Sequence, residues 1–157
     1  MSEKRYIFEA IQIRALEDIR RFYILASIIS LSLGVGIYFF FRNSHILFFE
    51  WMPIFKFFNG VYIPIKHSFF GSVILFNMPD ALWILIIIFF LRYLWFDYKK
   101  LQNIYIISIY GVAVIIEMSQ LSKYIPGTFD ILDLVFMGIA AFAEGLLYKT
   151  LSKRRSV

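Results

Sequence analysis

Twenty consecutive residues without a charged side chain, from Phe22 to Phe41, constrain this chain more than any other feature. Arg21 and Arg42 bracket the run, which as a helix would extend about 30 Å and so match the hydrocarbon core of a bilayer. Of the 157 residues, 61% are apolar and 17% charged, and the mean hydropathy is +0.73. This exceeds what an ordinary soluble core buries, so a freestanding soluble domain is excluded.

Three further apolar runs, over residues 81–96, 101–120 and 131–148, predict three more crossings. The fold class is therefore an all-α membrane protein with four transmembrane helices and both termini on one side. Pro79 suits the first position of the second crossing, and Arg92 within it is expected to snorkel to its far end. Glu144, in the fourth crossing, is expected to face the bundle or to snorkel toward the basic tail.

The segments outside the crossings divide into three parts. Residues 1–21 repeat apolar side chains at helical spacing and predict a cytoplasmic amphipathic helix lying in the membrane interface. Two alternatives stay open: a solvated helix held by pairs such as Glu17 with Arg21, and a surface that docks a partner. Residues 149–157 form a basic tail.

Residues 42–80 form the third part, an outer segment rich in Phe and Trp (FFEWMPIFKFF, then SFFGSVILF). Proline and glycine break it into short pieces. We therefore expect a re-entrant segment or interfacial helices here rather than a fifth crossing. Residues 22–148, which include this outer segment, form the expected four-helix transmembrane domain.

The basic residues set the orientation. Eleven of the 16 Lys and Arg lie in the N-terminal segment, the link between the second and third crossings, and the tail, whereas four lie on the other side. The positive-inside rule predicts cytoplasmic termini. Because these residues cluster beside apolar runs, the bilayer is the expected partner and nucleic acid is not. Since the chain has no cysteine, it has no disulfide and no thiolate ligand.

The same orientation brings four carboxyl groups, those of Asp80, Glu117, Asp130 and Asp133, to the outer ends of three crossings. Charged groups at membrane depth cost at least about 2.5 kcal/mol at the bilayer centre and usually face a protein interior or a wet cavity. The sequence therefore predicts a shared, outward-facing acidic site.

The four acidic residues differ in how well helix capping explains them. Asp80, Asp130 and Asp133 stand at helix starts, where an aspartate caps free N–H groups and complements the helix dipole. Glu117 lies near the end of a crossing, where the dipole and the apolar surroundings both disfavour its ionised form, so it is the strongest functional candidate. Gln120, three residues on, is placed to orient the Glu117 carboxyl or a ligand.

A structural alternative for Glu117 is a paired glutamate bonded to Gln120, Lys123 or Arg42. His45 and His67 flank the aromatic outer segment, but their spacing matches no ligand motif. We therefore expect no metal site and no cofactor.

Several short motifs resemble the C-terminal half of VanZ-like membrane proteins over about residues 79–148. They are Pro79–Asp80, EMSQ at 117–120, PGTFDILDL at 126–134, and the small-residue helix through Ala140 and Ala141 to Gly145. The chain departs from the family pattern at Thr128, where many members have arginine, and at Met137, where many have asparagine. It also lacks the Lys and His that often follow the family's earlier aspartate. The resemblance implies a protein of the bacterial cytoplasmic membrane, of a type linked to reduced susceptibility to glycopeptide antibiotics such as teicoplanin.

The main functional hypothesis is catalysis in the cell envelope on an outer-leaflet lipid, lipid-linked glycan or peptide. Glu117 would be the general acid or base, Asp130 or Asp133 would orient it, and Asp80, Gln120 and Thr128 would bind substrate. The alternative is a non-catalytic accessory subunit of a larger envelope membrane complex. Proton or ion translocation is a third hypothesis with less support, because only Glu144 and Arg92 lie toward the inner half.

Overall fold

A computed structural model of the chain describes residues 3–41, 69–122 and 129–154. Every regular element in these residues is a helix: α1 (Glu3–Phe41), α3 (Phe69–Leu94), α4 (Lys99–Gln120) and α5 (Ile131–Arg154). Each contains a stretch long and apolar enough to cross a membrane. The predicted all-α class with four membrane-length helices is therefore confirmed.

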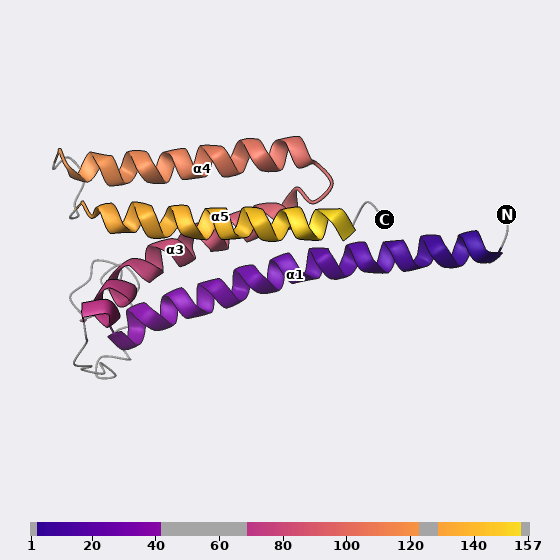
Figure 1. Cartoon of the computed structure of the whole chain (residues 1–157), viewed down its shortest axis with the longest axis horizontal. Helices are drawn as coiled ribbons and strands as arrows, with labels where there is room; N and C mark the ends of the chain where they lie inside the picture. Colours follow the sequence, from indigo (N-terminus) through magenta and orange to yellow (C-terminus); the bar gives the residue numbers. More distant parts are fainter. Residues whose placement is uncertain (1–2, 42–68, 123–128, 155–157) are drawn as a thin grey trace, which may run out of the picture.

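The helices lie lengthwise beside one another, and α3 packs against α1, α5 and α4 (Figure 1). The turn between α3 and α4 lies at the same end of the bundle as the start of α1 and the end of α5; we call it the turn end. At the opposite end α4 stops and α5 begins, and we call this the acidic end. The central position of α3 makes it the helix that connects the other three.

Helix α1 joins two segments that were expected to be separate, the interfacial helix of residues 1–21 and the crossing of residues 22–41. No proline or glycine interrupts the chain before Gly34, so nothing in the sequence breaks the helix at the expected boundary, and Arg21 Nη2, just before that boundary, lies 3.8 Å from Glu17 Oε2 one turn earlier. At about 1.5 Å per residue, its 39 residues extend about 58 Å, roughly twice the hydrocarbon thickness. The first turns of α1 therefore project past α5 at the turn end (Figure 1).

Small side chains let α1 approach α3. Ser27, Ser30 and Gly34 are buried on one face of α1, and Ser27 Oγ donates a hydrogen bond of 3.0 Å to the carbonyl oxygen of Ile86. A Cβ atom added at Gly34 would meet Leu82 Cβ at 3.7 Å, which is ordinary contact. In a bilayer, such close packing and interhelical hydrogen bonds are what hold helices together.

Helix α3 begins at Phe69, twelve residues before the expected start of the second crossing. Residues 69–80 therefore belong to α3 rather than to the outer segment, and Pro79 lies inside the helix instead of at its first position. Proline is tolerated within membrane helices because neighbouring groups compensate for its missing N–H. The apolar run before Pro79 continues the helix, which is why proline alone was a poor boundary signal. Residues 42–68 of the expected outer segment lie outside the described residues.

Helices α4 and α5 lie close to their predicted bounds, although α5 continues through most of the basic tail to Arg154. Two apolar clusters form the core. One centres on Tyr23, Phe89 and Phe96 near the turn end. The other consists of Ile84 and Ile88 of α3 and Met137 of α5, with partly buried residues of α4 packed against it.

Candidate functional site

Polar side chains attach α4 to its neighbours at both of its ends. The buried residues of α4 are Gln102 and Glu117, one near each end of the helix and about 22 Å apart along its axis. An apolar membrane helix gains nothing from burying polar groups unless they are hydrogen-bonded. These two residues therefore mark two polar sites, one at the acidic end and one at the turn end.

At the acidic end, Glu117 connects the end of α4 to the start of α5. Its Oε1 accepts a hydrogen bond of 3.0 Å from the backbone N–H of Asp130, and its Oε2 accepts one of 3.3 Å from Gln120 Nε2. Only 7% of Glu117 is exposed. The expected contact with Gln120 is thus confirmed, while the backbone donor from Asp130 is a partner that the sequence did not indicate. Lys123 lies outside the described residues.

Asp130 is the N-cap of α5, as the capping interpretation proposed. Its Oδ1 accepts a hydrogen bond of 2.9 Å from the N–H of Leu132, and its carbonyl accepts one of 3.1 Å from the N–H of Asp133. Asp130 and Glu117 together satisfy N–H groups that a helix start leaves free. Both carboxylates therefore have a structural task in addition to any chemical one.

Asp133 of α5 lies across from Asp80 of α3, with the two carboxyl groups within hydrogen-bonding reach of each other. A hydrogen bond between two carboxyl groups requires that they share a proton, since two bare carboxylates repel. The Asp133 carboxyl is also close enough to Glu117 and Asp130 to interact electrostatically with both. The structure thus brings Asp80, Glu117, Asp130 and Asp133 into one acidic cluster, with Asp80 and Asp133 as its carboxyl pair.

Gln120 and Thr128 are the two other residues that the sequence placed in the site. Gln120 contacts the cluster through Glu117, whereas Thr128 lies outside the described residues. No group of three or more acidic or histidine side chains in the described ranges is arranged to hold a metal ion. His45 and His67 lie outside those ranges.

Asn77 is a buried polar residue beside the cluster that sequence reasoning missed. It is 2% exposed, and its Nδ2 donates a hydrogen bond of 2.7 Å to the carbonyl of Val73. Its Oδ1 has no hydrogen-bond partner among the residues described. Asn77 lies one turn before Asp80 and, at spacings of seven and eleven, on the same face of α3 as Ile84 and Ile88. The signal for it in the sequence was a lone amide within a long apolar run.

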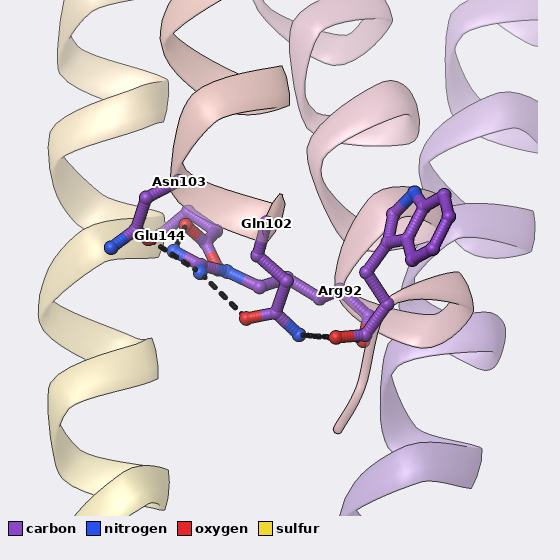
Figure 2. Close-up of polar contacts among 5 residues, drawn as sticks. Arg92, Gln102, Asn103 and Glu144 are labelled. Atoms are coloured by element: carbon purple, nitrogen blue, oxygen red, sulfur yellow. Dashed lines mark hydrogen bonds and ion pairs between the residues drawn. The ribbon is translucent and has the colours of Figure 1, made fainter. Parts of the chain in front are cut away.

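At the turn end, Arg92 forms a buried network with three residues of α4 and α5 (Figure 2). Its Nε and Nη2 donate to the two carboxylate oxygens of Glu144, at 3.0 and 3.2 Å. Its Nη1 donates to Gln102 Oε1 at 3.1 Å and to Asn103 Oδ1 at 3.3 Å. Because Arg92 is only 4% exposed, the expectation that it snorkels is wrong, whereas the expectation that Glu144 faces the bundle is confirmed.

Two further contacts make this arginine network specific. The guanidinium carbon of Arg92 lies 3.6 Å from the centre of the Tyr148 ring, a cation–π contact. Gln102 Nε2 donates to the carbonyls of Arg92 and Trp95, at 3.3 and 2.8 Å, and so caps the end of α3. These contacts give nearly all N–H donors of the buried Arg92 guanidinium a partner. Arg92 therefore does not need to reach the membrane interface.

Comparisons of the chain with protein-family models, with curated proteins and with solved structures found no match.

Proposed function

We propose that this chain is a VanZ-like multi-pass protein of the bacterial cytoplasmic membrane. In this proposal the acidic end faces outward, and the cluster acts on an outer-leaflet lipid, a lipid-linked glycan or a peptide. The distribution of Lys and Arg supports the orientation, because the turn end carries Lys99 and Lys100 and lies beside both helix ends that lead to the basic termini.

The observation that carries a chemical role is that the carboxyl groups of Asp80 and Asp133 lie within hydrogen-bonding reach of each other. A pair that holds one proton contains both a general acid and a general base, so it can protonate a leaving group and deprotonate an attacking hydroxyl. Such a pair suits hydrolysis or transfer at a polar headgroup bond.

This proposal changes the roles expected from the sequence. Glu117 already accepts two hydrogen bonds and Asp130 caps α5, so we assign to both the positioning of the start of α5 and hence of Asp133. The acid–base role passes to the carboxyl pair. Asn77, with its unused acceptor one turn away, is the residue best placed to bind a donor group of the substrate.

Replacement of Asp133 by asparagine tests the proposal without removing the contact. The amide of the new side chain can donate a hydrogen bond to Asp80, so the helices stay joined, but it cannot transfer a proton. The chain would be expressed in a teicoplanin-susceptible bacterium at matched membrane levels, and the antibiotic concentration that stops growth would be measured. We expect the native chain to raise that concentration and D133N to abolish the increase.

Asp18, an exposed acidic residue of α1, supplies the control variant D18N, which should behave as the native chain does. Full protection by D133N would overturn the acid–base role. No effect of the native chain would contradict the VanZ-like role itself.

The second candidate function is that of a non-catalytic accessory subunit, favoured by the capping contacts that Glu117 and Asp130 make. In that case D133N keeps full function, and another membrane protein co-purifies stoichiometrically in mild detergent. Ion translocation has less support, because the apolar cluster of Ile84, Ile88 and Met137 lies between the acidic cluster and the arginine network.

A further inference from the structure

A groove of about 170 Å³ opens at the turn end, where α1 runs past the turn that follows α3. One face of α1 and the turn line it, through Ile13, Leu16, Glu17, Arg20, Phe96 and Asp97. At about 30 Å³ per water molecule, its volume equals that of five or six waters. This is room for a small polar group of a few non-hydrogen atoms.

Aromatic side chains indicate the depth of the groove. Trp95 stacks on Tyr105 with ring centres 5.6 Å apart and meets Tyr98 edge to face at 6.1 Å. Rings with one apolar and one polar edge gather at the headgroup level of membrane proteins, and Lys99 and Lys100 follow directly. The groove, which shares this turn, therefore opens at the level of the lipid headgroups.

The lining combines an apolar floor with charges of both signs. Leu16 and Phe96 form the floor, and Phe96 is 6% exposed. Arg20 is held with its guanidinium carbon 5.0 Å from the centre of the Tyr93 ring, which restricts where its charge can lie. Glu17 and Asp97 supply two carboxylates to the same lining.

We propose that this groove binds the headgroup of a zwitterionic phospholipid that carries a primary ammonium, of the phosphatidylethanolamine type. Arg20 would bind the phosphate, Glu17 and Asp97 would accept hydrogen bonds from the ammonium, and the glycerol end would rest on the apolar floor. Arg20 complements the phosphate and the two carboxylates complement the ammonium. The Glu17 carboxylate lies 3.8 Å from Arg21 Nη2, but its remaining lone pairs can still accept from the ammonium. An anionic headgroup without an amine would instead face two carboxylates.

Lipid retention measured by native mass spectrometry tests this directly on the full chain. The delipidated protein would be offered equal amounts of phosphatidylethanolamine, phosphatidylcholine and phosphatidylglycerol of identical acyl chains. We expect phosphatidylethanolamine to be retained about tenfold better than phosphatidylglycerol, equivalent to about 1.4 kcal/mol, with phosphatidylcholine between them because its nitrogen donates no hydrogen bond.

Variants locate the binding. R20Q should lower retention of all three lipids, whereas the E17Q/D97N double variant should remove the preference for phosphatidylethanolamine over phosphatidylcholine. R14Q, on another face of α1 and outside the groove, is the matched control and should change neither. All four side chains lie at the surface, and far-ultraviolet circular dichroism would confirm equal folding.

The proposal is overturned if phosphatidylglycerol is retained as well as phosphatidylethanolamine, or if R14Q acts as R20Q does. It is also overturned if R20Q converts a dimer to a monomer with no effect on lipid, because a second copy would then be the occupant.

Discussion

The arginine network at the turn end supplies the sharpest test of how this bundle is held together. Replacing Glu144 by alanine leaves the Arg92 charge buried with only two neutral acceptors, Gln102 and Asn103. The two charged side chains are 5% and 2% exposed, so solvent cannot take over the lost partner. Removing one member of a buried ion pair costs about 3 kcal/mol or more, and we expect E144A to lower the free energy of unfolding by about 3 kcal/mol.

The double variant R92M/E144L removes both charges and replaces them with apolar side chains of similar size. We expect R92M and E144L alone each to cost about 3 kcal/mol, as E144A does, and the double variant to be no less stable than either of them. The double-mutant cycle then gives a coupling of about 3 kcal/mol. Glu17 and Arg21 form a matched control pair, because their side chains lie 3.8 Å apart but are 61% and 73% exposed. The corresponding cycle there should give less than about 0.5 kcal/mol.

Unfolding of the purified chain in mixed micelles by increasing dodecyl sulfate, followed by far-ultraviolet circular dichroism, measures these differences. Additive single-variant effects at Arg92 and Glu144 would refute the reasoning. So would a loss below about 1 kcal/mol in E144A, since the pair would then be no stronger than a surface contact.

Two smaller changes test packing between helices by the same assay. A Cβ atom at Gly138 would lie 3.1 Å from the Tyr110 hydroxyl, whereas Gly145 has open space, so G138A should be about 1 kcal/mol less stable than G145A, and Y110F should remove that difference. S27A should lose about 0.6 kcal/mol with its interhelical hydrogen bond, whereas S32A, whose hydroxyl bonds within its own helix, should lose nothing measurable. Equal effects within either set would count against the packing described.

The four crossings were predictable because each depends only on a local run of apolar residues, and charge-free length is a strong signal. The boundaries of the helices were less predictable than their existence. Residues 69–80 read as a broken outer segment because Pro79 is a boundary signal in soluble helices, but in α3 it lies inside the helix. The boundary expected at Arg21 was also wrong. Arg21 marks where the charge-free sequence begins, whereas the helix begins earlier, at Glu3.

The composition of the acidic cluster was predictable, and so was the contact between Glu117 and Gln120, but its other contacts were not. Orientation and spacing indicated that Asp80, Glu117, Asp130 and Asp133 share one end, because each was expected at the outer end of a crossing. The structure corrects this for Asp80, which lies inside α3 and not at its start, so helix capping does not explain it. That Glu117 accepts from the N–H of Asp130 depends on how the start of α5 is placed against the end of α4, which no spacing encodes. The ion pair of Arg92 with Glu144 joins residues that are 52 positions apart in the sequence, so spacing could not indicate it. A single charged residue near a helix end is most simply expected to snorkel, which is why the sequence predicted that for Arg92.

Sided labelling of single cysteines tests the outward orientation of the acidic cluster most directly. The native chain has no cysteine, so S122C reports the acidic end and S152C the turn end without background. With a membrane-impermeant maleimide on intact cells, we expect S122C to react at once and S152C to react only after the cells are lysed. Labelling of S152C in intact cells with S122C protected would place the carboxyl pair in the cytoplasm and contradict an action on the outer leaflet.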